Sequence, residues 1–314
     1  MLYRKLIKFG DSSFVISLPK EWVDKNSLKK GDVIGIDMGA KNELFILPKS
    51  KGERELTETT INLDSLPNPE SLKTFIISAY MKHYDTINIV GGDLIKSSEN
   101  IRRYFHDLAS IEIVEQGSKK ITARCFLDAN NLSVPALIRR LDVMTRSMLM
   151  DAETSISSEN MKEYVYQKEY DVTRLTFLIF KTLRKALVEP ELANKLKLDP
   201  LAILQAWNVV ASLEDIADQA KRLCKHLGKG RVKNRKKLED IFKRLMEQYG
   251  NATKAYHTND RDLAMKVVQN RNALMAACKE YLEESVDTVT VSIIEKIRRA
   301  AVYVSNIAKI TIDR

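Results

Sequence analysis

The chain has 314 residues, of which 44% are hydrophobic and 30% are charged, and this is typical of a globular protein with two or three domains. No run of about 18 uncharged apolar residues occurs, so we expect no insertion into a membrane. The first residues, MLYRKLIKFGDSS, lack the apolar core of a signal peptide, and we therefore expect a cytoplasmic protein. Cys125, Cys224, Cys278 and the four histidines are scattered, which argues against a zinc site.

The formal net charge is +9, which favours polyanionic partners such as nucleic acid or an anionic membrane surface. The positive charge is concentrated, because nine basic residues and no acidic residue lie between Lys221 and Lys237. A run of this kind is more often a solvated loop between helices than a binding surface, and both interpretations stay open.

Residues 1 to about 50 carry the pattern of a small β-rich module. The predicted strands cover 3–9, 14–18, 33–37 and 44–47, with turns at 10–13 and 28–32. Pro19 suits the first turn of a short helix, which we predict over 20–25. Four short strands cannot close a good core alone, so this module is expected to need a partner chain.

Two further regions follow along the chain. Residues 53 to about 130 predict a small α/β middle domain, with strands at 60–63, 86–90, 111–115 and 121–127 and helices at 69–84 and 98–108. From 133 to 314 the pattern is all-helical, with predicted helices at 133–156, 159–187, 198–227, 235–257, 259–283 and 286–313. These helices form two triplets, about 133–227 and 235–314, which suggests a duplicated three-helix bundle.

The N-terminal module resembles the AbrB/MazE/SpoVT swapped-hairpin family. The stretch RKLIKFGDSSFVISLPKEW, followed by LKKGD at 28–32, has that family's basic strand, glycine-serine turn, apolar strand, LPK, short helix and L-x-x-G-D turn. The resemblance implies a homodimer in which two chains interleave hairpins into a β-barrel. It also implies DNA binding through basic residues on one face.

Physical reasoning about the same module agrees with this expectation. Phosphate contacts need cations and hydroxyl donors on a rigid frame, and the candidate DNA-binding residues are Arg4, Lys5, Lys8, Ser12, Ser13 and Lys20. Each basic residue alone is more often a solvated surface charge, and only the set points to DNA. We expect Arg4 to read bases directly, because its forked guanidinium engages guanine edges.

The helical region looks like the PhoU family of phosphate-uptake regulators. LEDIADQA at 213–220 resembles its helix signature, a carboxylate followed four residues later by aspartate, and YVSNIA at 303–308 resembles its closing segment. Two matching helix triplets are also that family's architecture. An archaeal-type arrangement that joins a swapped-hairpin head to a PhoU-like body fits the entire chain.

The resemblance implies a metal site in the first triplet. Glu214 and Asp218 lie one helical turn apart, and Asp171 or Glu169 would complete an oxygen-ligand set for a divalent or iron-type ion. The alternative is a structural role, because Lys221 and Arg222 are close in sequence and offer salt-bridge partners.

The sequence also departs from the family's metal pattern. Gln167 stands where an acid is expected in the first triplet. In the second triplet Glu295 is followed by Arg299, which would repel a cation, so a metal site in the second triplet is expected to be lost.

Two other motifs are weaker. Gly91-Gly92-Asp93 follows a predicted strand and suits a turn better than an anion site. Asp11-Ser12-Ser13 has no histidine nearby, which argues against a nucleophilic serine. We therefore expect a protein that is not an enzyme and has no catalytic residues.

The leading hypothesis is a dimeric, DNA-binding transcriptional regulator of phosphate-uptake genes. In this hypothesis the PhoU-like region senses phosphate status through an ion, a ligand or a partner protein. The alternative is a PhoU-type adaptor that docks on a phosphate transporter or a sensor kinase, with the N-terminal module acting as a dimerisation clasp.

Overall fold

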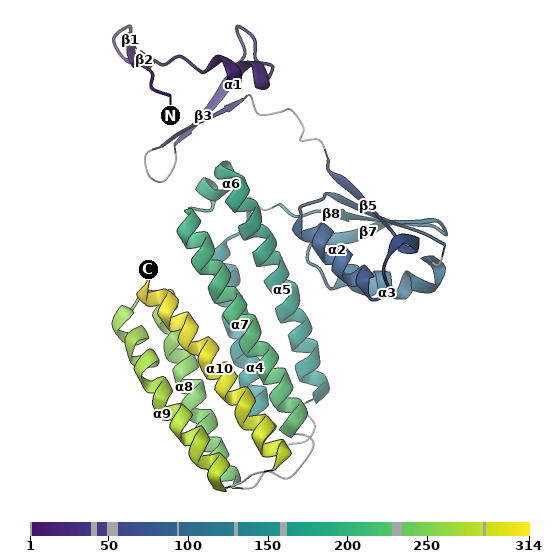
Figure 1. The fold of residues 1–314 in the computed structure, drawn as a ribbon, viewed down its shortest axis with the longest axis vertical. Helices are drawn as coiled ribbons and strands as arrows, with labels where there is room; N and C mark the ends of the chain where they lie inside the picture. The colour runs from purple at the N-terminus through teal and green to yellow at the C-terminus, as the bar shows by residue number, and fades with distance from the viewer. Residues whose placement is uncertain are drawn as a thin grey trace. The chain divides into compact units, whose positions relative to one another are not determined.

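The computed structural model describes residues 2–38, 43–48, 56–92, 94–128, 131–157, 162–227, 234–284 and 287–314. The chain divides into two compact units, Met1–Glu55 and Leu56–Arg314, which are treated separately below (Figure 1). The predicted α/β and helical regions both belong to the second unit.

The N-terminal unit contains two antiparallel hairpins and a short helix. The elements are β1 (Ile7–Phe9), β2 (Ser13–Val15), α1 (Lys20–Lys25), β3 (Ile34–Met38) and β4 (Leu44–Pro48). The first strand begins later than predicted, at Ile7 rather than at Tyr3. The turn between β1 and β2 requires its glycine, because Gly10 has φ +71°, which side-chain-bearing residues rarely adopt.

The second unit begins with an α/β layer. Its elements are β5 (Glu58–Asn62), η1 (Leu63–Ser65), α2 (Ser71–Met81), β6 (Thr86–Val90), α3 (Leu94–His106), β7 (Ile111–Gln116) and β8 (Lys120–Cys125). The strand order is β5-β6-β8-β7, in which β5 and β6 are parallel and the other pairs are antiparallel. The helices α2 and α3 cover one face of this sheet, and Ile76, Ile87 and Phe105 lie in the core between them.

The rest of the second unit is helical. Its elements are α4 (Val134–Thr154), α5 (Lys162–Val188), α6 (Pro190–Lys195), α7 (Pro200–Leu227), α8 (Arg235–Thr258), α9 (Arg261–Glu284) and α10 (Thr288–Ile312). The long helices form the two predicted triplets, α4/α5/α7 and α8/α9/α10, and α7 packs against α10 between them (Figure 1). The short helix α6 was not predicted from the sequence.

Helix α5 also joins the helical region to the α/β layer. Phe177 packs against the core of the layer, and the hydroxyl of Tyr170 lies 2.5 Å from Nδ1 of His106. Among the described residues, no helix combines the length and the apolar character needed to cross a membrane.

Candidate nucleic-acid interface

The candidate DNA-binding residues lie on and around the first hairpin. Arg4 and Lys5 precede β1, Lys8 lies in β1, Ser12 and Ser13 close the turn and open β2, and Lys20 opens α1; all six are exposed. None of the four cations pairs with an acid among the residues that the structure describes. Their charges are therefore available to an external polyanion.

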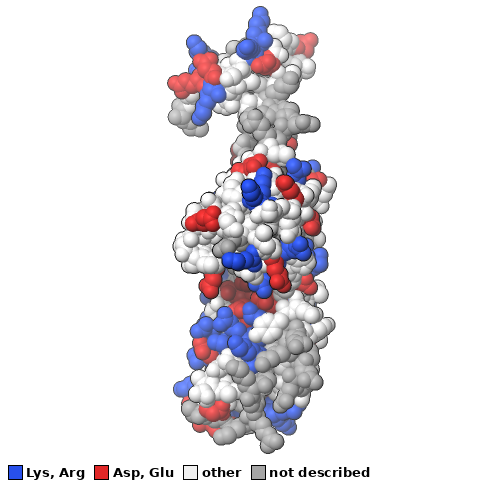
Figure 2. All heavy atoms as spheres, turned by 90° about the vertical axis from the view of Figure 1, so that its right-hand side faces the viewer, with Lys and Arg blue, Asp and Glu red and all other residues white. Residues whose placement is uncertain are grey.

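The hairpin does not place every candidate on one face. Lys8 lies opposite Phe14 in the ladder, whereas Ser13 lies opposite Phe9, so Lys8 and Ser13 project from opposite faces. On the face shown in Figure 2, the basic side chains of the N-terminal unit are interspersed with acidic ones. The interface is therefore a local set of donors rather than a continuous basic surface.

The frame that carries these donors is held by local hydrogen bonds. In the turn after α1, the backbone N–H of Lys29 donates to Oδ2 of Asp32 at 2.7 Å, and Gly31 has φ +95°. These two features explain why the L-x-x-G-D turn needs both its glycine and its aspartate.

The N-terminal unit lacks a buried core of its own. Every residue in 2–36, 38 and 43–48 is exposed or half-buried. The exposed large apolar side chains are Leu2, Tyr3, Leu6, Ile7, Phe9, Phe14, Val15, Ile16, Val33, Ile36, Met38 and Leu44. An apolar surface of this extent indicates an interaction surface for another molecule.

The predicted acidic site on α7 holds cationic side chains of the same chain. Nζ of Lys221 lies 2.9 Å from Oε1 of Glu169 and 3.1 Å from Oδ1 of Asp218. Nε of Arg222 lies 2.6 Å from Oδ2 of Asp218. Glu169 is the α5 acid that reaches this cluster, because it shares Lys221 with Asp218 and its charge acts on Glu214. Asp171 is exposed.

The electrostatics of this cluster follow from crowding of like charges. Burial raises the pKa of Glu214, and the neighbouring carboxylates of Asp215, Asp218 and Glu169 raise it further. Lys221 opposes this effect. The pKa of the lysine is itself raised, because the hydrogen bonds that it donates to Glu169 and Asp218 outweigh burial. Lys221 therefore supplies positive charge that balances the carboxylates of Glu169 and Asp218, as a bound metal ion would.

Cations of the same chain occupy oxygens that a metal ion at this site would need. Both oxygens of Asp218 and one oxygen of Glu169 are occupied by Lys221 and Arg222. No cluster of three or more acidic, histidine or cysteine side chains suited to a metal occurs in the described part of the chain. In the second triplet, Glu295 pairs with Arg299 at 2.5 Å. Metal binding by Asp171, Glu214 and Asp218 stays a prediction.

The basic run between Lys221 and Lys237 is largely engaged with acids where the structure describes it. Arg235 pairs with Glu239, and Lys237 pairs with Glu280 and Glu284. Lys229, Arg231 and Lys233 lie outside the described residues. The paired cations of this run, Lys221, Arg222, Arg235 and Lys237, thus offer little free charge to a polyanion.

One other feature of the second unit bears on a weaker prediction, the glycine turn at 91–92. The backbone N–H of Gly92 donates to the carboxylate of Asp64 at 3.1 Å. This amide already has an anionic partner, which agrees with a turn at 91–92 rather than an anion site. Asp93 lies outside the described residues.

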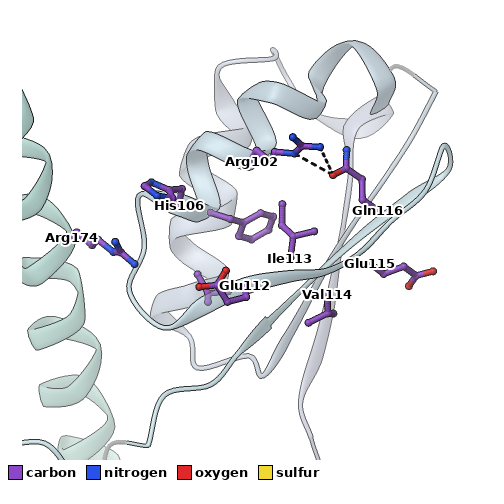
Figure 3. Close-up of a pocket in the computed structure, with 10 residues that line it drawn as sticks. Arg102, His106, Glu112, Ile113, Val114, Glu115, Gln116 and Arg174 are labelled. Atoms are coloured by element: carbon purple, nitrogen blue, oxygen red, sulfur yellow. Dashed lines mark hydrogen bonds between the residues drawn. The ribbon is translucent and has the colours of Figure 1, made fainter.

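A cavity of about 400 Å³ opens between α3, β7 and α5, and the sequence analysis did not predict it (Figure 3). Arg102 donates to Oε1 of Gln116 at its edge, and Arg174 reaches it from α5. Glu112 and Glu115 also line it, so its balanced charges select no ligand class.

Family models match the N-terminal unit and the first helix triplet. A family model described as the antidote-toxin recognition protein MazE, a bacterial antitoxin, matches residues 7–54. The PhoU domain model matches residues 138–227. One segment of the chain is therefore similar to MazE, and a second segment is similar to the PhoU domain.

Solved structures of two PhoU proteins are similar to this chain. PhoU from Pseudomonas aeruginosa is 16% identical, with 57% of this chain and 90% of that chain covered and a TM-score of 0.47. The phosphate transport system regulatory protein PhoU from Streptococcus pneumoniae is also 16% identical, with 57% and 91% covered and a TM-score of 0.48. A search of the curated proteins finds no match.

Proposed function

We propose that this protein is a homodimeric DNA-binding transcriptional regulator of phosphate-uptake genes. The observation that carries the proposal is the N-terminal hairpin unit, whose four candidate cations have no acidic partner among the described residues. The match of one segment to a MazE-type model and of another to the PhoU domain supports the link between DNA and phosphate-related regulation.

Contact with DNA would rest mainly on the phosphate backbone. Arg4, Lys5, Lys8 and Lys20 would neutralise phosphates and release counterions, while Ser12 and Ser13 would donate hydroxyl hydrogen bonds. Because Lys8 and Ser13 project from opposite faces of one hairpin, a single hairpin cannot present the whole set to one groove. A second copy of the hairpin is needed to complete the interface.

The second copy would also bury the apolar face of the other hairpin. In the β3–β4 ladder Ile36 lies opposite Ile46 and Met38 lies opposite Leu44, so these side chains share one face. Burying such side chains contributes roughly 1.5–3 kcal/mol each. This contribution supports a dimer as the form that binds DNA.

The signal would enter through the helical region, as an ion, a ligand or a partner protein. A ligand changes DNA affinity only if it binds one geometry of the dimer better than another. A divalent or iron-type ion at Asp171, Glu214 and Asp218 would have to displace Lys221 and Arg222 from Asp218.

The proposal is tested by recovering genomic DNA with the full-length protein from cells grown at high and at low phosphate. We expect enrichment at phosphate-transport promoters that changes with phosphate, and a flat profile would contradict the proposal. In vitro, affinity for a recovered promoter should fall steeply with salt, because bound phosphates release counterions.

Paired variants locate the interface. Replacing Arg4 and Lys5 together by glutamine should abolish promoter binding. The matched control replaces Lys29 and Lys30, which are equally exposed cations of the same unit, and should retain most of the affinity.

The alternative is an adaptor that docks on a phosphate transporter or a sensor kinase. Arg235 and Lys237 of the basic run pair with acids of the same chain, so these two cations do not favour DNA over a protein partner. Salt-insensitive binding to such a membrane-protein partner, without DNA affinity, would favour the adaptor and its dimerisation clasp.

A further inference from the structure

A cysteine and a buried lysine meet where the α/β layer contacts the helical region. Sγ of Cys125, at the end of β8, lies 3.1 Å from Nζ of Lys181 on α5. The two residues are 56 positions apart in the chain. Only the docking of the layer on α5 brings them together.

The amine of Lys181 is enclosed. The residue is 3% exposed, and its Nζ lies 3.9 Å from the centroid of the Tyr80 ring. The hydroxyl of Tyr80 donates to the carbonyl of Ala109, so the tyrosine offers the lysine its ring rather than its oxygen. Sulfur is a weak hydrogen-bond acceptor, which leaves a buried ammonium poorly solvated here.

The protonation of Lys181 reflects this enclosure. Burial lowers the pKa of Lys181, although the charges of Cys125 and Asp85 act in the opposite direction; Lys185 lowers it further. A neutral, nucleophilic amine is therefore more accessible at this lysine than at an exposed one. If the sulfur of Cys125 is oxidised, it becomes an electrophile within reach of this amine.

Cys125 differs from the other two cysteines in its exposure to solvent and in its contact with a lysine. Cys125 is half-buried, whereas Cys224 and Cys278 are buried. Burial raises the pKa of the Cys224 thiol and of the Cys278 thiol to about 11, which suppresses their reactive thiolates. Neither makes a hydrogen bond to a lysine among the described residues.

We propose that Cys125 and Lys181 form a peroxide-responsive modification site, in which oxidation joins the two side chains through a sulfur–nitrogen bond. The Cys125 thiolate attacks one oxygen of hydrogen peroxide, and the O–O bond breaks. Sulfur is oxidised to sulfenic acid, and the departing hydroxide takes a proton from the Lys181 ammonium to form water. The resulting amine attacks sulfur, and the S–O bond breaks. The leaving hydroxide takes one amine proton, so that a second water forms.

The product is a sulfenamide that links β8 to α5, and it is reversible, because two equivalents of an external thiol restore the cysteine and the amine and leave a disulfide. The bond would fix the α/β layer covalently to the helical region. This inference does not depend on DNA binding.

The experiment treats the full-length, reduced protein with hydrogen peroxide. We expect a mass about 2 Da below that of the reduced chain, restored by dithiothreitol, because two hydrogens are lost in forming the bond. Tryptic mapping should find a Cys125–Lys181 peptide pair and no cleavage after Lys181. An unlinked Cys125 that carries added oxygen, with normal cleavage after Lys181, would overturn the proposal.

Variants separate the chemistry from the fold. Lys181→Arg keeps the charge but removes the amine, and Cys125→Ser removes the sulfur, so each should lose the link. Lys185→Arg changes a lysine one turn away on α5, which pairs with Glu189, and should keep it. If Lys181→Arg fails to fold, the wild-type peptide map still decides, because a link from Cys125 to any other residue contradicts the proposal.

Discussion

The hydroxyl of Tyr249 on α8 donates a hydrogen bond to Oδ1 of Asp142 on α4, at 2.7 Å. The other oxygen of this carboxylate lies 3.1 Å from Nε2 of His257, and Asp142 is only 7% exposed. The two helices belong to different triplets. A buried, satisfied carboxylate therefore ties one half of the helical region to the other.

Removing the tyrosine hydroxyl should destabilise the helical region. In Tyr249→Phe the carboxylate of Asp142 loses a donor inside the protein, and we expect a loss of about 1–3 kcal/mol in the free energy of unfolding. Urea titration followed by circular dichroism measures this change. Tyr164→Phe removes an exposed hydroxyl from α5 and should stay within about 0.5 kcal/mol of wild type.

The same carboxylate predicts a pH dependence. Burial alone would raise the pKa of Asp142, but hydrogen bonds from His257 and Tyr249 and the charge of Arg146 outweigh burial and lower it. Because the pKa is lower in the folded state, the stabilisation is fully present above the unfolded pKa of about 3.9 and is lost as pH falls through the folded pKa.

The difference in stability between wild type and Asp142→Asn should therefore be largest near neutral pH. It should shrink as the pH drops below about 4, where wild-type Asp142 also becomes protonated. Urea midpoints of both proteins, measured at matched pH values, give this difference. A difference that stays constant from neutral to acidic pH would show that Asp142 acts by its shape rather than by its charge.

The turn after β6 offers a matched pair of glycines. Gly91 has φ +137°, and an added Cβ would lie 2.8 Å from Cβ of Leu63, whereas a Cβ on Gly92 would meet only Oδ1 of Asp64 at 3.7 Å. We expect Gly91→Ala to lower the free energy of unfolding by at least about 1 kcal/mol. Gly92→Ala should cost clearly less in the same thermal or urea measurement. Equal losses would mean that the backbone at Gly91 relaxes.

The elements that could be predicted with correct bounds are those that begin or end at a proline or a glycine. The helix Lys20–Lys25 has its predicted bounds, because Pro19 fixes its start. The strand Thr86–Val90 also has its predicted bounds, because two glycines follow its last residue. Pro190 lies in the gap between the predicted helices 159–187 and 198–227, and in the structure it occupies the first turn of the short helix α6. A proline in that position is compatible with both outcomes.

Contacts between distant segments explain what the sequence analysis missed. Asp142 meets Tyr249 across 107 positions, and neither residue stands in a recognisable motif. The acidic pair Glu214 and Asp218 could be placed on one helix stripe, but the choice of Glu169 over Asp171 depends on the rotation of α5. Periodicity does not fix that rotation to within one residue.

The metal prediction can be tested directly on the acidic cluster. Mn²⁺ titration followed by calorimetry should show weak or no binding to wild type, because Lys221 occupies oxygens of Glu169 and Asp218. Lys221→Met should raise Mn²⁺ affinity by about tenfold or more, since like charges left unpaired attract a cation. Wild-type binding that is lost in Asp218→Asn would instead support a resident metal that displaces the lysine.

Dimer formation is tested on the second hairpin. Ile36 is 65% exposed in the single chain, on the face that it shares with Met38, Leu44 and Ile46. If a second copy covers this face, Ile36→Asp places a charge in an apolar interface twice in each symmetric dimer. We expect the dissociation constant to rise by at least about hundredfold, which corresponds to roughly 2.7 kcal/mol.

Sedimentation velocity across a concentration series measures this shift, and Val143→Asp provides the matched control. Val143 is 66% exposed on α4, so Val143→Asp adds the same charge and removes a similar, slightly smaller apolar side chain outside the proposed interface. The control should remain dimeric, whereas Ile36→Asp should be monomeric at concentrations at which wild type is dimeric.

Ile36→Asp should also lose promoter binding, because one hairpin does not present Lys8 and Ser13 on the same face. A dimeric Ile36→Asp would mean that the copies associate elsewhere, and a monomeric form that still binds DNA would separate DNA binding from dimerisation.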